Sequence, residues 1–209
     1  MFLKKQLILF LSALLCFTHS VSASTLLVMG DSLSAAYNLR QAEGWVSLLE
    51  NQLAQSHPDI KVVNASISGE TSQGGLSRFD ALLSEQKPCW VILELGANDA
   101  LRGYPLEKTT ENLETMIEQA LEVNAKVLLI GNQIPQNYGQ RYAEMFYRLY
   151  EKIANQYEIE YLPFMLEGVA LNKSLMQADG LHPNEEAQPF VLENIFPYLQ
   201  SLLDEDKIG

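Results

Sequence analysis

The chain alternates between short apolar runs and longer segments with apolar residues at helical spacing. The runs cover residues 25–29, 60–64, 90–95, 126–130 and, more weakly, 160–163. They have the length of strands and lack the strict polar alternation of a sheet with one face in water. This pattern predicts strands that are covered on both faces, as in a parallel sheet.

Apolar stripes between these runs predict amphipathic helices. The stripes comprise Trp45, Leu48, Leu49 and Leu53; Leu113, Met116, Ile117, Ala120 and Leu121; and Tyr142, Met145, Phe146, Leu149, Tyr150 and Ile153. We interpret the last stripe as core, and we expect a final helix after Asn184, a favourable N-cap residue. Alternating strands and helices predict a parallel sheet between two helical layers, with the chemistry in loops at the carboxyl ends of the strands.

The first 23 residues resemble a secretory signal peptide. Lys4 and Lys5 precede an apolar stretch over residues 7–17, and small side chains end the segment at Ala23. The apolar stretch is shorter than the roughly 20 residues that span a bilayer, so we expect cleavage rather than an anchor. The expected organisation is a signal peptide over residues 1–23 and one hydrolase domain over residues 24–209, exported to the periplasm and not inserted in a membrane.

The formal charge of −12 becomes more negative still when the leader with its two lysines is removed. A chain this acidic is repelled by nucleic acids and anionic membranes, so neither is an expected partner. Cys89 is the cysteine that remains after cleavage, so no disulfide within the chain is expected. Because it lies between Pro88 and an apolar run, we expect a buried structural thiol.

Polar segments follow several of the predicted strands. They read Gly-Asp-Ser-Leu-Ser over residues 30–34, Ser-Gly-Glu-Thr-Ser over 68–72, and Gly-Ala-Asn-Asp over 96–99, and Asp-Gly-Leu-His-Pro follows near the C-terminus over 179–183. The loops after parallel strands meet at one edge of a sheet. We therefore expect these segments to converge.

A serine nucleophile needs a base, a group that orients the base, and donors for the oxyanion. Of the histidines, His19 belongs to the leader and His57 lies in a polar turn, which leaves His182 as the candidate base. Asp179 precedes it by three residues, and Pro183 restricts its backbone. Asp179 is then placed to accept from Nδ1 of His182 while Nε2 faces the nucleophile. An isolated Asp-x-x-His is more often an ordinary surface turn, so the spacing alone does not decide its role.

The four segments and their order resemble the GDSL, or SGNH, hydrolase family over essentially the whole mature chain. The resemblance implies a flavodoxin-like three-layer α/β/α sandwich with a central five-stranded parallel sheet. It implies Ser32 as nucleophile, His182 as general base and Asp179 as the third member of the triad. It also implies an oxyanion hole made by Ser32, Gly69 and Asn98.

Longer matches over residues 30–37, 64–72 and 94–103 resemble the bacterial periplasmic acyl-CoA thioesterase I, lysophospholipase and arylesterase subgroup. The resemblance implies hydrolysis of carboxylic esters and acyl thioesters through an acyl-enzyme, with lysophospholipids, acyl-CoA and aryl esters as candidate substrates. Ala97 and Ala100 stand where the subgroup is expected to have glycine, which puts the substrate range in question. The candidate substrate-binding residues are Leu101, Ile134, Pro135 and Tyr138.

Three buried or flanking acids are expected to act structurally. Glu94 lies in an apolar strand and needs a hydrogen-bonding partner, and Asp31 and Asp99 are expected to hold loops. No metal or nucleotide motif is present, so we expect no cofactor and no metal site. The expected protein is a monomer that acts on a small acyl ester or thioester. The alternatives are a carbohydrate O-acetylesterase with the same triad and a non-catalytic lipid- or glycan-binding protein.

Overall fold

The computed structural model describes residues 24–205, and within this range the apolar runs form one parallel sheet. The strands are β1 (Ser24–Gly30), β2 (Ile60–Asn64), β3 (Trp90–Glu94), β4 (Lys126–Ile130) and β5 (Glu160–Leu162). Their order across the sheet is β2-β1-β3-β4-β5, and every pair is parallel. This is the flavodoxin-like order. The strand predictions are therefore confirmed, and so is the fold class.

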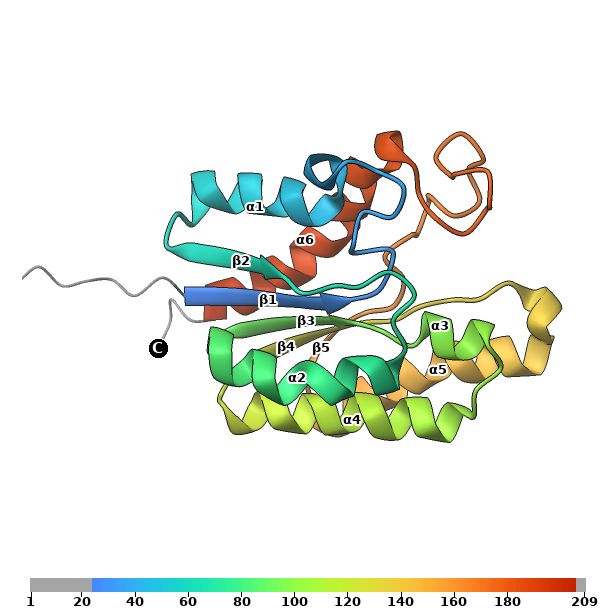
Figure 1. Ribbon diagram of the computed structural model, residues 1–209, viewed down its shortest axis with the longest axis horizontal. Coiled ribbons are helices and arrows are strands. Elements are labelled where there is room, and N and C mark those ends of the chain that lie inside the picture. The colour runs from blue at the N-terminus through green and yellow to red at the C-terminus, as the bar shows by residue number, and fades with distance from the viewer. Residues whose placement is uncertain (1–23, 206–209) are drawn as a thin grey trace, which may run out of the picture.

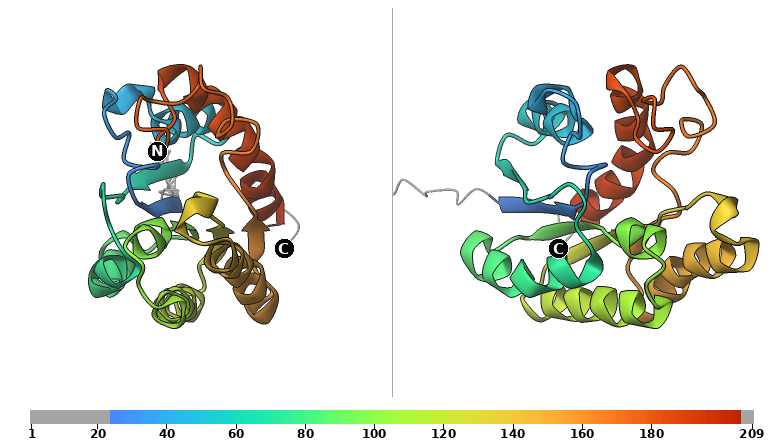
Figure 2. Two further views of the ribbon diagram at one scale, coloured as in Figure 1. Left: turned by 90° about the vertical axis from the view of Figure 1, so that its right-hand side faces the viewer. Right: turned by 45° about the vertical axis from the view of Figure 1, so that its right-hand side comes forward.

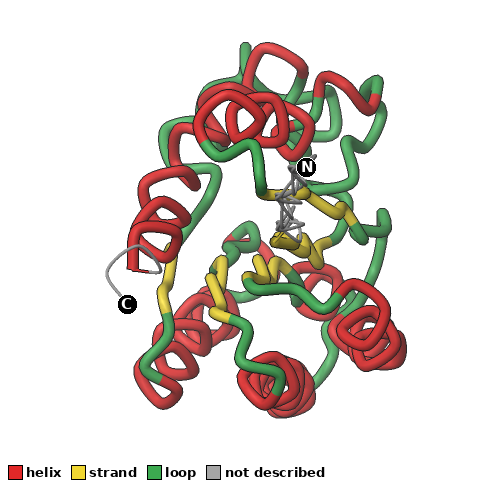
Figure 3. The backbone as a smooth tube through the Cα atoms, turned by 90° about the vertical axis from the view of Figure 1, so that its left-hand side faces the viewer, coloured by secondary structure: helices red, strands yellow, loops and turns green. Residues whose placement is uncertain are grey.

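Helices cover both faces of the sheet (Figures 1 and 3). One face carries α1 (Trp45–Ser56) and α6 (Gln188–Glu205), and the other carries α2 (Ser72–Gln86), α4 (Leu106–Glu122) and α5 (Gln140–Tyr157). Short elements complete the set: α3 (Ala97–Leu101), η1 (Gln41–Glu43), η2 (Gln136–Tyr138) and η3 (Glu185–Ala187). Each helical layer has its own apolar core against the sheet.

The strand side chains divide between these two cores by the alternation of the pleat. Leu27 and Met29 belong to the core under α2, α4 and α5, whereas Leu26 and Val28 belong to the core under α1 and α6. All four are fully buried. The continuous apolar strand pattern thus reflects burial of both faces, as predicted.

The final helix begins slightly later than the sequence predicts. Asn184 accepts a hydrogen bond from the amide of Ala187 and caps η3, and α6 follows directly at Gln188. The prediction of a cap at Asn184 is confirmed, although the first turn that it caps is a 3-10 turn.

Cys89 contradicts its prediction. Its side chain is exposed, directly before β3. The apolar run that follows is buried from Trp90 onward. Cys89 itself lies outside the strand, so the burial of the strand does not extend to the thiol.

The predicted division at residue 23 lies at the limit of the described residues. β1 begins at Ser24, directly after the proposed cleavage site. Among residues 24–205, no helix has both the length and the apolar character needed to cross a membrane.

Candidate active site

The carboxyl ends of β1, β2 and β3 bring the sequence-predicted residues to one edge of the sheet, the edge that faces the reader in the left panel of Figure 2. Ser32 follows β1, Gly69 follows β2 and Asn98 follows β3. The strand order reverses at β1, where β2 lies on one side and β3 on the other. Such a reversal point opens a crevice for ligands in parallel α/β folds. Three of the four segments therefore converge as predicted, and His182 of the fourth is 2.8 Å from Ser32.

The loop that carries Ser32 is a tight turn. Backbone amides of Ala35 and Tyr37 donate to the carbonyl oxygens of Asp31 and Ser32 at 2.9 and 3.3 Å. Gly30, which ends β1, lies so close to Glu94 that a Cβ atom at this position would be 2.7 Å from Glu94 Oε2. Only glycine fits there without displacement, so the Gly-Asp-Ser pattern has a steric cause.

His182 lies between Ser32 and Asp179. Its Nε2 is 2.8 Å from Ser32 Oγ, and its Nδ1 is 2.7 Å from Asp179 Oδ2. The ring of Tyr37 packs against the imidazole with 4.5 Å between ring centroids. With Nδ1 donating to the carboxylate, Nε2 is left to accept the hydroxyl proton of Ser32.

Asp179 is held by its own turn. Burial raises its pKa, but amide donors from Leu181 and His182 and the contact with the imidazole outweigh this, so the pKa of Asp179 lies below its usual value. The two amides donate to Oδ1 at 2.9 and 3.1 Å. Asp179 therefore stays ionised over the pH range in which a histidine base works.

The candidate oxyanion residues are also anchored. Asn98 Nδ2 donates to Asp31 Oδ2 at 2.9 Å, which leaves its second amide hydrogen for a ligand. Gly69 has a φ of +79°, a left-handed conformation that favours glycine. The guanidinium of Arg102 donates to the Gly69 carbonyl oxygen at 2.9 Å. Backbone bonds from Ala65 and Ile67 to β1 hold the approach to this loop beside the Ser32 turn.

Two buried carboxyl groups lie beneath the Ser32 turn. Glu94 accepts from Ser34 Oγ at 2.8 Å, and from the Asp31 amide and Asn132 Nδ2 at 3.3 Å each. Burial, together with the nearby Asp31, raises the pKa of Glu94 well above its usual value. Burial also raises the pKa of Asp31 to about 6, against the opposing effect of the Leu33 amide, His182 and Asn98.

These contacts confirm the structural roles expected of the acids. Glu94 joins the ends of β1, β3 and β4, and Asp31 accepts from the backbone of Leu33 at 3.0 Å. Asp99 accepts from the amide and hydroxyl of Ser72 at 2.8 and 2.6 Å and thereby ties α3 to the start of α2.

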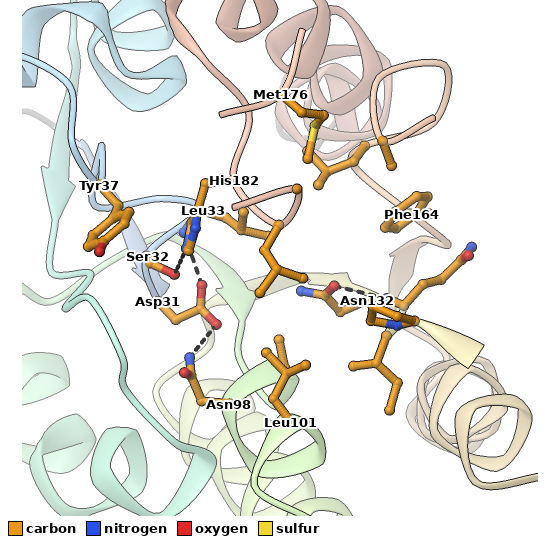
Figure 4. Close-up of a pocket in the computed structure, with 18 of the residues that line it drawn as sticks. Asp31, Ser32, Leu33, Tyr37, Asn98, Leu101, Asn132, Phe164, Met176 and His182 are labelled. Atoms are coloured by element: carbon orange, nitrogen blue, oxygen red, sulfur yellow. Dashed lines mark hydrogen bonds between the residues drawn. The ribbon is translucent and has the colours of Figure 1, made fainter. Parts of the chain in front are cut away.

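A cavity of about 920 Å³ opens beside Ser32 and His182 (Figure 4). Ser32, Gly69, Asn98 and His182 all line it. Most of the remaining wall is apolar and includes Leu33, Leu101, Ile134, Pro135, Phe164, Leu166, Ala170, Leu171, Met176 and Leu181. Ser32, Gly69, Asn98 and His182 thus meet at a largely apolar chamber, although Asn132, Gln133, Gln136 and Glu167 add polar side chains elsewhere in its wall. The arrangement suits an apolar group attached to a reactive polar centre.

The four candidate substrate-binding residues divide into two groups. Leu101, Ile134 and Pro135 lie in the cavity wall, whereas Tyr138 does not and is 45% exposed in η2. Gln136, the first residue of η2, still lines the cavity, and Tyr138 at the end of this 3-10 helix no longer does. The structure does not support a substrate contact for Tyr138.

Part of the cavity wall was not predicted. The segment from 163 to 183 contributes Phe164, Leu166 and Met176, and Asn132 contributes a polar group near β4. The apolar cluster of residues 162–166 was a usable signal, but nothing in its spacing shows that a loop without helix or strand lines a cavity. Within residues 24–205, no cluster of three or more His, Cys, Asp or Glu side chains is arranged to hold a metal ion.

A doubly wound α/β sandwich with a Ser–His–Asp array at the carboxyl edge of its sheet belongs to the class of serine hydrolases. Comparison with known proteins narrows this class. Residues 28–188 match the GDSL-like Lipase/Acylhydrolase family. The chain therefore belongs to this family and is an ester-hydrolysing enzyme.

Individual relatives agree with this assignment. The chain is 51% identical to the esterase TesA of Pseudomonas aeruginosa, over 91% of this chain and 95% of that protein. It is 42% identical to the thioesterase 1/protease 1/lysophospholipase L1 of Escherichia coli K12, over 94% of this chain and 93% of that protein. A crystal structure of the psychrotrophic esterase EstA from a Pseudoalteromonas species, inhibited by monoethylphosphonate, superimposes with a TM-score of 0.83 at 42% identity, covering 87% of this chain and 99% of that one.

Proposed function

We propose that the chain hydrolyses medium- and long-chain acyl esters and thioesters through an acyl-enzyme formed on Ser32. Lysophospholipids, acyl-CoA and aryl esters are the candidate substrates. The observation that carries this proposal is the union of the Ser32–His182–Asp179 array with an apolar cavity of about 920 Å³ at the same point. The names of the relatives, an esterase and a thioesterase/lysophospholipase, support the same chemistry.

In the first half of the reaction, Ser32 Oγ attacks the acyl carbonyl carbon while its proton passes to His182 Nε2. The 2.8 Å separation of these atoms supports the transfer. Asp179 holds the imidazole in the required tautomer and stabilises the imidazolium that forms. The imidazolium then protonates the leaving alcohol or thiol, and the acyl group stays on Ser32.

In the second half, water attacks the acyl carbonyl carbon while His182 Nε2 takes its proton. The bond between the acyl carbon and Ser32 Oγ then breaks, the imidazolium returns the proton to Oγ, and the carboxylic acid leaves. The oxyanion that forms in each half is assigned to the amides of Ser32 and Gly69 and to the side chain of Asn98. Asp31 supports this assignment because its bond to one hydrogen of Asn98 Nδ2 fixes the direction of the other. Removing one such donor typically lowers kcat by about 100- to 1,000-fold.

The cavity sets the expected chain-length preference. Burial of one methylene contributes about 0.8 kcal/mol, so each further carbon that stays inside the apolar chamber strengthens binding. A chamber of this volume accepts far more than an acetyl group, and apolar residues form most of its wall. An O-acetylesterase acting on carbohydrates is therefore the less favoured alternative.

We further propose that the enzyme is exported to the periplasm after cleavage at Ala23 and acts there as a monomer. The leader pattern supports export. A single chain provides Ser32, His182, Asn98 and the cavity wall, which supports activity without a second copy.

Hydrolysis of p-nitrophenyl acetate, butyrate, octanoate and palmitate by the mature enzyme tests this function, with Ser32→Ala as the matched variant. We expect kcat/KM to rise from acetate to octanoate and Ser32→Ala to be inactive on all four. Decanoyl thioester hydrolysis, followed by release of free thiol, extends the test to thioesters. A preference for acetate would support the carbohydrate esterase, and activity in Ser32→Ala would refute the proposed nucleophile.

A further inference from the structure

The segment that carries the proposed base has little regular structure to hold it. Residues 163–184, between β5 and η3, contain no helix or strand, and their pairing is a single bridge between Met176 and Pro183. Asp179 lies on the exposed side of this segment. The nucleophile, in contrast, sits on a turn fixed directly to the buried sheet. The Ser32–His182 distance therefore depends on how this segment is fastened to that turn.

Gln177 makes contacts on both sides of this junction. Its Nε2 donates to the carbonyl oxygens of Tyr37 and Pro183, each at 3.0 Å. Its Oε1 accepts from Asn38 Nδ2 at 3.4 Å. Its backbone amide donates to the carbonyl of His182 at 2.8 Å. One side chain thus joins the turn that follows the proposed nucleophile, at Tyr37 and Asn38, to Pro183, which directly follows the proposed base.

The turn after Ser32 has an unusual backbone conformation where it contacts Gln177. Ala36 and Asn38 have φ values of 55° and 56°, so left-handed residues flank Tyr37 on both sides. The carbonyl of Tyr37 accepts from Gln177 while its ring packs against His182. Left-handed conformations are costly for residues other than glycine and persist where the surroundings hold them. The contacts of Tyr37 and Asn38 with the base segment are part of those surroundings.

Few other hydrogen bonds join the two segments, beside the packing of the Tyr37 ring on His182. In the described structure, the hydrogen bonds between residues 31–39 and 172–184 are the Ser32–His182 contact itself and the bonds that Gln177 makes with Tyr37 and Asn38. We propose that Gln177 is a positioning residue that fixes His182 against Ser32 through these cross-segment bonds. The inference rests on the proposed roles of Ser32 and His182 and adds a residue to which no catalytic role is otherwise assigned.

Replacing Gln177 by methionine tests the inference. Methionine keeps the length of the side chain but cannot donate to the carbonyls of Tyr37 and Pro183. A misplacement of about 1 Å in a catalytic site can lower the rate about 100-fold, so we expect kcat for p-nitrophenyl octanoate to fall about 10- to 100-fold. KM is expected to change less than about twofold, because the cavity wall stays intact. Inactivation by a p-nitrophenyl phosphonate, which uses the same attack by Ser32, is expected to slow in parallel.

Gln188→Met is the matched control. Gln188 is 2% exposed, accepts from the amide of Trp45 at 3.0 Å and donates to the carbonyls of Asn184 and Pro183 at 3.2 and 3.5 Å. It shares the Pro183 acceptor with Gln177 but makes no bond to residues 31–39. We expect this variant to lose more thermal stability than Gln177→Met, because its bonds are buried, and to lose less than about threefold in kcat. Equal losses of kcat in the two variants would overturn the positioning role.

A second substitution guards against a variant that fails to fold. Gln177→Glu keeps the shape of glutamine, but its carboxylate cannot donate to either carbonyl, and the same fall in kcat is expected. If Ser32→Ala is inactive but a folded Gln177 variant keeps its kcat, the positioning role of Gln177 is refuted and the proposed function is not. Activity in Ser32→Ala would instead refute the proposed function on which the inference rests.

Discussion

At the scale of single residues, the buried pair Glu94 and Asp31 has a consequence for stability. Burial raises both pKa values, that of Asp31 to about 6, and the neighbouring Asp31 raises the pKa of Glu94 further. Between pH 4 and 6 the folded chain therefore holds protons that the unfolded chain has already lost. The contribution of Asp31 to stability is complete below about pH 4 and is lost as the pH rises through about 6. The contribution of Glu94 is likewise present at low pH and is lost as the pH rises through its raised pKa. A shift of this size corresponds to roughly 3 kcal/mol for Asp31.

Glu94→Gln tests this dependence. Glutamine resembles the protonated acid and does not ionise, so the variant removes the titration of Glu94 and its interaction with Asp31. We expect the free energy of unfolding to fall less between pH 5 and pH 8 in the variant than in the wild type, by about 1–3 kcal/mol. Urea unfolding followed by circular dichroism at several pH values measures the difference. Glu50→Gln, an exposed glutamate of α1, is the control, and parallel curves for all three proteins would contradict the prediction.

The residues that we propose to carry the chemistry were predictable from the sequence, and the amides that hold the site together were not. Ser32, Asn98 and His182 stand in short motifs whose residue types, taken together in this order, indicate nucleophilic catalysis. Gln177 and Asn132 are amides in ordinary polar surroundings of the sequence. They make contacts with residues far away in the chain, so no local pattern indicates these contacts. The prediction for Cys89 failed for a related reason, because the burial of β3 ends abruptly at its first residue.

At the scale of elements, the segment after β4 divides into a part that lines the cavity and a part that does not. Ile134 is 7% exposed and lines the cavity, whereas Tyr138 lies outside it. We expect Ile134→Ala to lower kcat/KM for p-nitrophenyl octanoate about 5- to 30-fold relative to acetate, because contact with the distal methylenes is lost. Tyr138→Ala is expected to change the two substrates equally. If Ile134→Ala lowers kcat/KM equally for the acetate and the octanoate ester, Ile134 does not contact the acyl chain.

Helix α2 packs unusually close to the sheet through Gly75. A Cβ atom there would lie 2.5 Å from Leu95 Cδ1 and 3.1 Å from Met29 Cε. We expect Gly75→Ala to cost about 1–3 kcal/mol of stability, which exceeds the helical gain of about 0.5–1 kcal/mol. Thermal unfolding is expected to shift downward by several degrees.

Gly74→Ala in the same helix is the matched control. Its Cβ would meet Glu70 Oε1, at the end of a side chain that can move. The helical gain then dominates, and the melting temperature is expected to stay the same or rise. A Gly75→Ala protein as stable as Gly74→Ala would show that the contact with Leu95 relaxes without cost.

These glycines also show why α2 was not predicted. The strands and the helices with strong apolar stripes were evident, but α2 contains adjacent glycines and a weaker stripe. Glycine disfavours helix on intrinsic grounds, and tertiary packing against the sheet overrides this preference. Likewise, residues 163–184 form cavity wall without helix or strand, so periodicity gave no information about them.

At the scale of the whole molecule, the strand order accounts for the way motifs separated by up to 150 residues form one site. β1 lies between β2 and β3, so the loops after these strands must meet. The segment between β5 and α6 then lies over these loops before the chain enters α6 (Figure 1). The alternation of strands and helices predicted this edge, because parallel crossovers leave little freedom. The sequence pattern did not predict that residues 163–184 form part of the cavity wall, because this depends on how the segment packs in the folded chain.

The boundary of the folded domain leads to the last prediction. β1 begins at Ser24 and pairs with β2 from that residue onward, so cleavage after Ala23 leaves the sheet complete. We expect the exported enzyme to begin at Ser24, which intact-mass measurement of a periplasmic extract determines. Ala23→Leu places a large side chain at the cleavage site, where a small one is required, and is expected to leave the precursor uncleaved in the membrane fraction. Because residues 24–205 are unchanged in that precursor, its esterase activity after detergent extraction is expected to match that of the mature enzyme. Full-length chain as the main active species in the cytosol would show that residues 1–23 do not direct export.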